Sequence, residues 1–225
     1  MSTQSILNGI ELVKPADIER RSMEIIESEL GDTSFLAPEQ LPVVKRVIHT
    51  TADFDYLHSL KFSPNAVQNG LNALRNKAVI ITDTQMALSG ISKPALKALG
   101  CEAFCFMSEP EIAEAARRNG TTRAAASMEH AARFFADTQL LFAVGNAPTA
   151  LVRLYELIGE KRVRPALIIG TPVGFVNVVK SKELIMQSGS PYIVAEGRKG
   201  GSSVAAAICN ALLYMLYDRS SGKQI

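Results

Sequence analysis

Short apolar runs alternate with amphipathic segments from residue 78 onward, and this pattern constrains the fold more than any other feature. Parallel strands are buried on both faces and need crossover helices between them. The sequence therefore predicts an α/β fold, a doubly wound and mainly parallel sheet with helices on both faces. The expected strands are 78–82, 102–107, 140–144, 166–169 and 192–195, and the expected helices are 94–99, 110–119, 122–136, 148–158, 178–187 and 202–217.

The residues before this alternation predict a helical N-terminal extension. Pro15 suits a first helical turn, apolar residues follow at helical spacing, and Gly31 marks a stop. A second helix is expected after Pro38, and Ser63-Pro64 is interpreted as the N-cap and first turn of a third. Because no repeat, Ser/Gly linker or charge block interrupts the chain, we expect a single domain over residues 1–225.

The composition argues against several classes of partner. The 24 Lys and Arg nearly balance the 22 Asp and Glu, and Trp is absent, so nucleic acid is not an expected partner. No run reaches the roughly 18 apolar residues of a membrane span, and Met1–Arg21 has no signal-peptide core. Three cysteines form no complete disulfide set, and no cluster offers three spaced metal ligands. We expect a cytoplasmic protein with no membrane segment and no metal site.

The segments that follow the expected strands are the most unusual in the chain. Ligands of doubly wound sheets bind at this carboxyl edge, where glycines allow close approach and helix starts attract anions. Carboxylates or phosphates are therefore the expected ligands, although each junction alone also fits a plain strand-to-helix turn. The glycine spacing matches neither common nucleotide-binding loop. The segments are Asp83–Met86, Gly145–Thr149, Gly170–Gly174 and Gly197–Ser203.

His49 is the candidate proton donor or acceptor. On the helix expected after Pro38, apolar residues take one arc, whereas Lys45, Arg46 and His49 take the other. A polar segment, residues 50–53, follows directly, so His49 stands at the helix end. Imidazole exchanges protons near neutral pH, which suits general acid–base catalysis. A solvent-exposed helix face with no catalytic role fits the same pattern.

Three further residues are considered as candidates for ligand binding or catalysis. Ser22 falls within the apolar arc of the first helix, as a packing residue or as a hydroxyl offered to a ligand. Arg123 follows the expected cap Thr121-Thr122, as a ligand-binding guanidinium or as a surface cation. His130, within an expected helix, is interpreted as structural. No catalytic-triad or zinc-hydrolase order is present, so neither chemistry is expected.

Taken together, the chain resembles the precorrin-8X methylmutase family of cobalamin biosynthesis, also called the cobalt-precorrin-8 methylmutases. Each matching segment is weak alone, but their joint order and spacing are specific, and they run from the first helix to the last. The segments are Ile18-Glu-Arg-Arg-Ser22, Arg46-Val-Ile-His49, Asp83-Thr-Gln-Met86, Gly120-Thr-Thr-Arg-Ala-Ala-Ala126, Gly145-Asn-Ala-Pro-Thr-Ala-Leu151, Gly170-Thr-Pro-Val-Gly-Phe-Val176 and Gly197-Arg-Lys-Gly-Gly-Ser202.

The resemblance implies an isomerase that moves a methyl group from C-11 to C-12 of precorrin-8X or cobalt-precorrin-8, giving hydrogenobyrinate or cobyrinate. It implies no cofactor, because the methyl group stays on the macrocycle. His49 corresponds to the family's catalytic histidine, which protonates the macrocycle during migration and then recovers the proton. Ser22, Arg46 and Arg123 correspond to substrate-binding residues. Family members are homodimers with active sites near the subunit interface, and a homodimer is expected here.

The chemistry of such a substrate agrees with the residues present. A precorrin carries acetate and propionate groups around an apolar face, so its site needs arginines and N–H donors beside apolar side chains. Arg46, Arg123 and Arg198 supply guanidinium groups, and Asp83 is also expected to bind substrate. Ala124 stands where family members carry serine, which puts a hydroxyl contact there in doubt. Both substrate forms stay open, since cobalt in the macrocycle needs no protein ligand.

Two other functions fit parts of the pattern. An S-adenosylmethionine-dependent methyltransferase binds its cofactor at the same edge of a similar sheet. Here, however, Asp83-Thr84-Gln85-Met86 stands where a glycine-rich turn is expected. A non-catalytic tetrapyrrole carrier would bind the same macrocycle, and only turnover separates it from a methylmutase.

Overall fold

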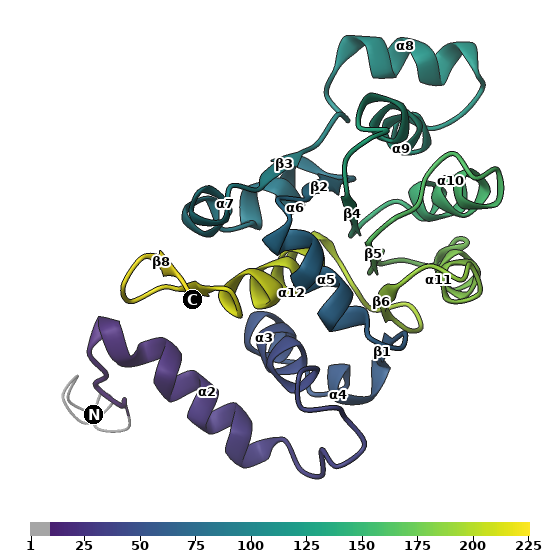
Figure 1. Ribbon diagram of the computed structural model, residues 1–225. Coiled ribbons are helices and arrows are strands. Elements are labelled where there is room, and N and C mark those ends of the chain that lie inside the picture. The colour runs from purple at the N-terminus through teal and green to yellow at the C-terminus, as the bar shows by residue number, and fades with distance from the viewer. Residues whose placement is uncertain (1–9) are drawn as a thin grey trace, which may run out of the picture.

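A six-stranded sheet forms the centre of the computed structural model, which describes residues 10–225 (Figure 1). Strands β2 to β6 run parallel, and β1 pairs antiparallel with β6 at one edge. The spatial order is β1-β6-β5-β4-β2-β3. The predicted class, an α/β fold with a mainly parallel sheet, is confirmed. The strands are β1 (Leu60–Phe62), β2 (Val79–Thr82), β3 (Glu102–Phe104), β4 (Leu140–Val144), β5 (Leu167–Gly170) and β6 (Tyr192–Ala195).

Helices cover both faces of the sheet (Figure 1). On one face lie α9 (Arg123–Phe134), α10 (Pro148–Gly159) and α11 (Val178–Met186), with α8 (Pro110–Arg118) packed outside α9. On the other lie α5 (Ala66–Arg75), α6 (Gln85–Gly90), α7 (Lys93–Leu99) and α12 (Ser202–Tyr214), with α3 (Leu41–Thr51) packed on α12. The sheet therefore separates two hydrophobic cores.

The alternating side-chain direction of a strand explains why the expected strands are continuously apolar. Ile80 faces the core of the α12 side, and its neighbour Ile81 faces the core of the α10 side. Leu141 and Phe142 on β4 divide in the same way. Because water reaches neither face, every residue of β2, β4 and β5 is apolar except Thr82 and Gly170.

The N-terminal extension is helical, as predicted. A 3₁₀ turn, η1 (Pro15–Asp17), leads into α2 (Ile18–Glu29), which packs on α3 and lies outside the sheet layers (Figure 1). A short helix, α4 (Tyr56–Ser59), joins α3 to β1, and a hairpin of β7 (Tyr217–Asp218) and β8 (Lys223–Gln224) ends the chain. No helix among the described residues has the length and apolarity to span a bilayer. The expectation for a signal peptide concerns in part residues 1–9, which lie outside the described residues.

Strand β1 was not predicted, and the helix cap proposed at Ser63-Pro64 is wrong. The Ser63 N–H donates to the Tyr192 carbonyl at 3.0 Å, and the Ser63 hydroxyl accepts the Tyr192 N–H at 2.9 Å. Helix α5 begins later, at Ala66, after Asn65 in the left-handed conformation. Ser63 therefore extends the pairing of β1 with β6. A three-residue strand is too short to show a period of two in the sequence.

Candidate active site

Asp83 fills the crevice between the carboxyl ends of β2 and β4. The chain leaves these neighbouring strands in opposite directions, which is where doubly wound sheets usually bind ligands. One carboxylate oxygen of Asp83 accepts the Gly145 N–H at 2.8 Å, and the other accepts the N–H groups of Asn146 at 2.9 Å and Ala147 at 2.6 Å. The N–H groups expected to bind an external anion at this junction therefore bind an internal carboxylate.

The direct substrate contact predicted for Asp83 does not fit this geometry. Its side chain is fully buried, so no part of the carboxylate faces a ligand. Burial raises the pKa of Asp83 above its ordinary value, and the three backbone N–H bonds oppose that shift. We therefore revise its role to that of a residue that ties the loop after β4 to the end of β2.

The loops after β5 and β6 are joined just as closely. The Gly201 N–H donates to the Thr171 carbonyl at 2.8 Å, and the Gly174 N–H donates to the Arg198 carbonyl at 3.2 Å. On the other side, the hydroxyls of Thr84 and Ser202 lie 2.8 Å apart, which joins the end of β2 to the start of α12. The carboxyl edge is thus one continuous, mutually supported surface.

Gly200 is required by this close approach, and its replacement tests it. A Cβ at Gly200 would lie 2.1 Å from the Thr171 carbonyl oxygen, at a φ of +155°, so we expect Gly200→Ala to destabilise the fold by about 3 kcal/mol. Gly197→Ala is the matched control, because its Cβ would meet nothing within 4 Å and only a φ of +79° is unfavourable, costing about 1 kcal/mol. Urea unfolding of both variants measures the difference, and equal losses would contradict the packing argument.

Lys199 connects the loop after β6 to the segment that follows α3. Its ammonium lies 2.7 Å from a carboxylate oxygen of Asp53 and 2.6 Å from one of Asp55. The hydrogen bond from Lys199 holds the pKa of Asp53 below its ordinary value. Since the lowered pKa favours the charged carboxylate, the link persists at neutral pH and is lost in acid, as pH falls through that lowered value.

His49 lies half-buried in the last turn of α3. The guanidinium of Arg46, one turn earlier, lies 5.1 Å from the ring of Tyr214 at the end of α12. Asp53, beyond α3, bonds to Lys199, which precedes α12. Helix α3 therefore runs antiparallel to α12, and the end that carries His49 points toward the carboxyl edge of the sheet.

Arg46 and Ser22 belong to the contact between α2 and α3. Arg46 forms an ion pair with Glu19 at 2.8 Å, so a substrate carboxylate would compete with Glu19 for it. Ser22 is half-buried one turn beyond Glu19, and Lys45 pairs with Glu27 at 3.1 Å. Within residues 10–225, no hydrogen bond or ion pair joins Ser22 or Arg46 to His49. Substrate binding by these two residues stays a prediction.

Arg123 and Arg198 are exposed at the carboxyl edge. Arg123 is the first residue of α9, whose cap Thr122 has its hydroxyl 2.7 Å from that of Thr149 at the start of α10. Arg198 lies in the loop after β6, with its guanidinium 5.4 Å from the ring centre of Phe175. Because β5 separates β4 from β6, the ends of β4 and β6 are about 10 Å apart, twice the strand spacing.

The sequence interpretation did not single out the exposed apolar side chains that follow β2 and β5. Phe175 is 81% exposed and Val176 80% exposed after β5, and Met86 is 72% exposed after β2. Their signal in the sequence is the presence of large apolar residues within junctions that are otherwise polar or rich in glycine. They give the carboxyl edge the apolar surface that a macrocycle requires.

Two surface pockets lie away from this edge. One of about 800 Å³ is lined by Asn69, Gln139 and Arg164, at the amino ends of the strands. Another of about 550 Å³ lies among α8, α9 and α10. Neither is lined by His49 or Arg198. The candidate site at the carboxyl edge is therefore separate from both pockets.

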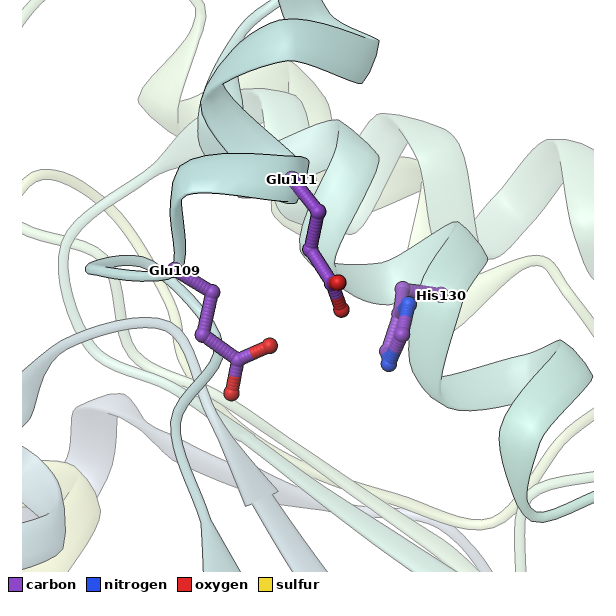
Figure 2. Close-up of side chains that lie close together, drawn as sticks. All are labelled: Glu109, Glu111 and His130. Carbon is purple, nitrogen blue, oxygen red and sulfur yellow. The ribbon is translucent and has the colours of Figure 1, made fainter.

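A cluster of Glu109, Glu111 and His130 also lies outside the candidate site. Figure 2 shows their side chains turned toward one another at the start of α8 and on α9, and their potential ligand atoms lie within 4.8 Å of one another. The positive end of α8 attracts the two carboxylates. The His130 ring packs 4.7 Å from that of Phe106 and 5.7 Å from that of Phe134. These contacts account for the cluster, and we assign it no metal role.

The sequence model of the precorrin-8X methylmutase family matches residues 17–215. The chain belongs to this family. A cobalt-precorrin-8 methylmutase of Leptospira interrogans is 43% identical, covering 90% of this chain and 94% of its own, and one of Salmonella typhimurium is 45% identical, covering 91% and 97%. The crystal structure of a precorrin-8X methylmutase from Thermus thermophilus matches with a TM-score of 0.81 and 39% identity, covering 88% of this chain and 96% of that one.

This membership confirms the predicted family and the predicted enzyme class, an isomerase of corrin biosynthesis. The matched range includes the residues at the carboxyl edge. The individual roles of these residues are proposals.

Proposed function

We propose that this methylmutase moves a methyl group from C-11 to C-12 of precorrin-8X or cobalt-precorrin-8, with His49 as the proton donor and acceptor. One observation carries the assignment of the site. The end of α3 that holds His49 is bonded through Asp53 to Lys199, next to the exposed Arg198. A proton-exchanging side chain and a carboxylate-binding one are therefore held at the same edge.

Substrate binding in this proposal uses the two exposed arginines and the start of α12. Arg123 and Arg198 bind peripheral carboxylates, and Phe175 and Val176 contact the apolar face of the macrocycle. No side chain caps the N-terminus of α12, so its first N–H groups add a further attraction for anions. Arg46 and Ser22 contribute from the side of α2 and α3.

The proposed mechanism asks the protein to hold one substrate conformation and to move one proton. His49 gives a proton to the macrocycle as the methyl group migrates and recovers it afterwards, so the product, hydrogenobyrinate or cobyrinate, is an isomer of the substrate. Rigid holding is supported by the ties among the loops after β2, β4, β5 and β6. No external methyl donor, metal or redox cofactor enters this scheme.

We further propose that residues 1–225 act as one cytoplasmic domain within a homodimer. The open carboxyl edge and its exposed Phe175 and Val176 suit a site that a second copy helps to cover. Light scattering of the purified protein tests the assembly, and a mass near twice the 24.3 kDa of one chain is expected. A mass of one chain at assay concentrations would contradict the homodimer.

Turnover is the test of the proposed function. Purified protein is incubated anaerobically with precorrin-8X and, separately, with cobalt-precorrin-8, while the visible spectrum is followed. Conversion of at least one form to the product chromophore is the expected result. Spectral binding without conversion would favour a carrier, and no response to either form would contradict the assignment.

A further inference from the structure

We propose that Lys182, a buried lysine of α11, is a positioning residue that fixes Arg198 for a substrate carboxylate. The inference rests on the proposed function. It concerns a residue that touches no exposed part of the site and that the sequence interpretation did not single out.

The Lys182 ammonium binds the backbone on both sides of Arg198. Its Nζ donates to the Gly197 carbonyl at 2.8 Å and to the Lys199 carbonyl at 2.9 Å. The Arg198 carbonyl accepts the Gly174 N–H at 3.2 Å. Three successive carbonyls of the loop are therefore held, two of them by one side chain, and Arg198 stands between the two points that Lys182 clamps.

The outward face of the same loop is held separately. Lys199 is bonded to Asp53 and Asp55, while the Arg198 guanidinium lies over Phe175 without an ion pair within the described part of the chain. Arg198 is thus the side chain of this turn left available to a ligand. Its direction depends on the backbone that Lys182 holds from beneath.

Burial of this lysine is costly and needs a compensating role. Lys182 is 1% exposed, and among residues 10–225 it has no carboxylate within ion-pair distance. Burial lowers its pKa to about 8, so the ammonium form still predominates at neutral pH. Charged donors make the stronger hydrogen bonds to carbonyl oxygens, which suits a side chain that holds a glycine-containing loop in one conformation.

A structural role and a positioning role for Lys182 predict different kinetics. If it only supports the fold, its replacement lowers stability and scales all activity by the folded fraction. If it positions Arg198, folded enzyme has a raised KM with kcat much less affected, because a binding contact made before the chemical step is lost. The increase in KM caused by replacing Lys182 must also disappear in a variant that already lacks the Arg198 side chain.

The experiment compares Lys182→Met, Arg198→Met and the double variant in steady-state turnover, with Lys180→Met as the matched control. Lys180 lies on the same helix but is exposed, and among residues 10–225 it pairs only with Glu183, at 3.1 Å. We expect Lys182→Met to raise KM about tenfold. The KM of the double variant should be no higher than that of Arg198→Met, and the KM of Lys180→Met should be unchanged. Lys182→Arg, which keeps the positive charge and its donors, should recover part of the loss.

Hydrogen exchange of the 197–201 amides gives a second readout that needs no substrate. Faster exchange confined to this loop is expected in Lys182→Met and not in Lys180→Met. Additive KM effects in the double variant, or unchanged loop exchange, would overturn the positioning role. Absence of turnover in the unaltered protein would instead contradict the proposed function, and the exchange result would still decide whether Lys182 holds the loop.

Discussion

Replacement of His49 by alanine is expected to lower kcat by about 10²- to 10⁴-fold, the usual contribution of a general acid or base. Folding should be preserved, because His49 lies on the less buried side of α3, away from the core residues Val47 and Ile48. Substrate affinity should change little, since the arginines and apolar side chains of the edge are untouched. The observable is the rate of the spectral change under saturating substrate.

His58→Ala is the matched control for this variant. His58 is exposed on α4, where its ring stacks 5.3 Å from that of Phe35. Its loss should leave kcat at the level of the unaltered enzyme. Normal turnover by His49→Ala, or an equal loss in both variants, would remove His49 from the proposed catalytic role.

Replacement of Asp83 by alanine is expected to cost about 3–5 kcal/mol of unfolding free energy. Three backbone N–H groups, the buried one of Gly145 and the partly buried ones of Asn146 and Ala147, would lose their acceptor at once. Asp83→Asn should also destabilise the fold, though less, because its amide group presents a donor where one of these N–H groups needs an oxygen. Urea unfolding at neutral pH measures both changes.

Asp32→Asn is the control for the Asp83 variants. Asp32 also accepts a backbone N–H, that of Ser34 at 2.9 Å, but on an exposed turn. Water can replace that acceptor, so the urea midpoint should scarcely move. Near-normal stability of Asp83→Ala would show that the loop after β4 does not depend on this carboxylate.

The local sequence pattern predicted most of the secondary structure. Runs such as 140–144 and 192–195 coincide with β4 and β6, because strands buried on both faces are continuously apolar. Pro148 likewise starts α10, since proline is suited to a first turn. The antiparallel strand β1 was missed, because Leu60–Phe62 acquires its extended form by pairing with residues far along the chain.

The sequence interpretation placed the candidate site at the carboxyl edge, and the roles of its residues stay predictions. Arg198 is exposed within the junction segment Gly197–Ser203, and Arg123 is exposed at the start of α9. Asp83 is buried and bonded to backbone N–H groups, which the sequence could not show, because the donors that a carboxylate meets depend on the fold. Lys182 gave no signal, because a lysine within an amphipathic helix ordinarily points to water.

The sequence by itself determined the α/β class, the helical extension and the family, because periodicity and segment order are properties of neighbouring residues. The tertiary structure alone decided the strand order, the capture of the loop after β4 by Asp83 and the burial of Lys182. These depend on contacts between residues far apart in the chain, such as Asp83 and Gly145, which are 62 positions apart, and Asp53 and Lys199, which are 146 positions apart. Only packing of the folded chain brings these side chains to their partners. Burial then removes Asp83 and Lys182 from water, so each must bond to the backbone groups beside it.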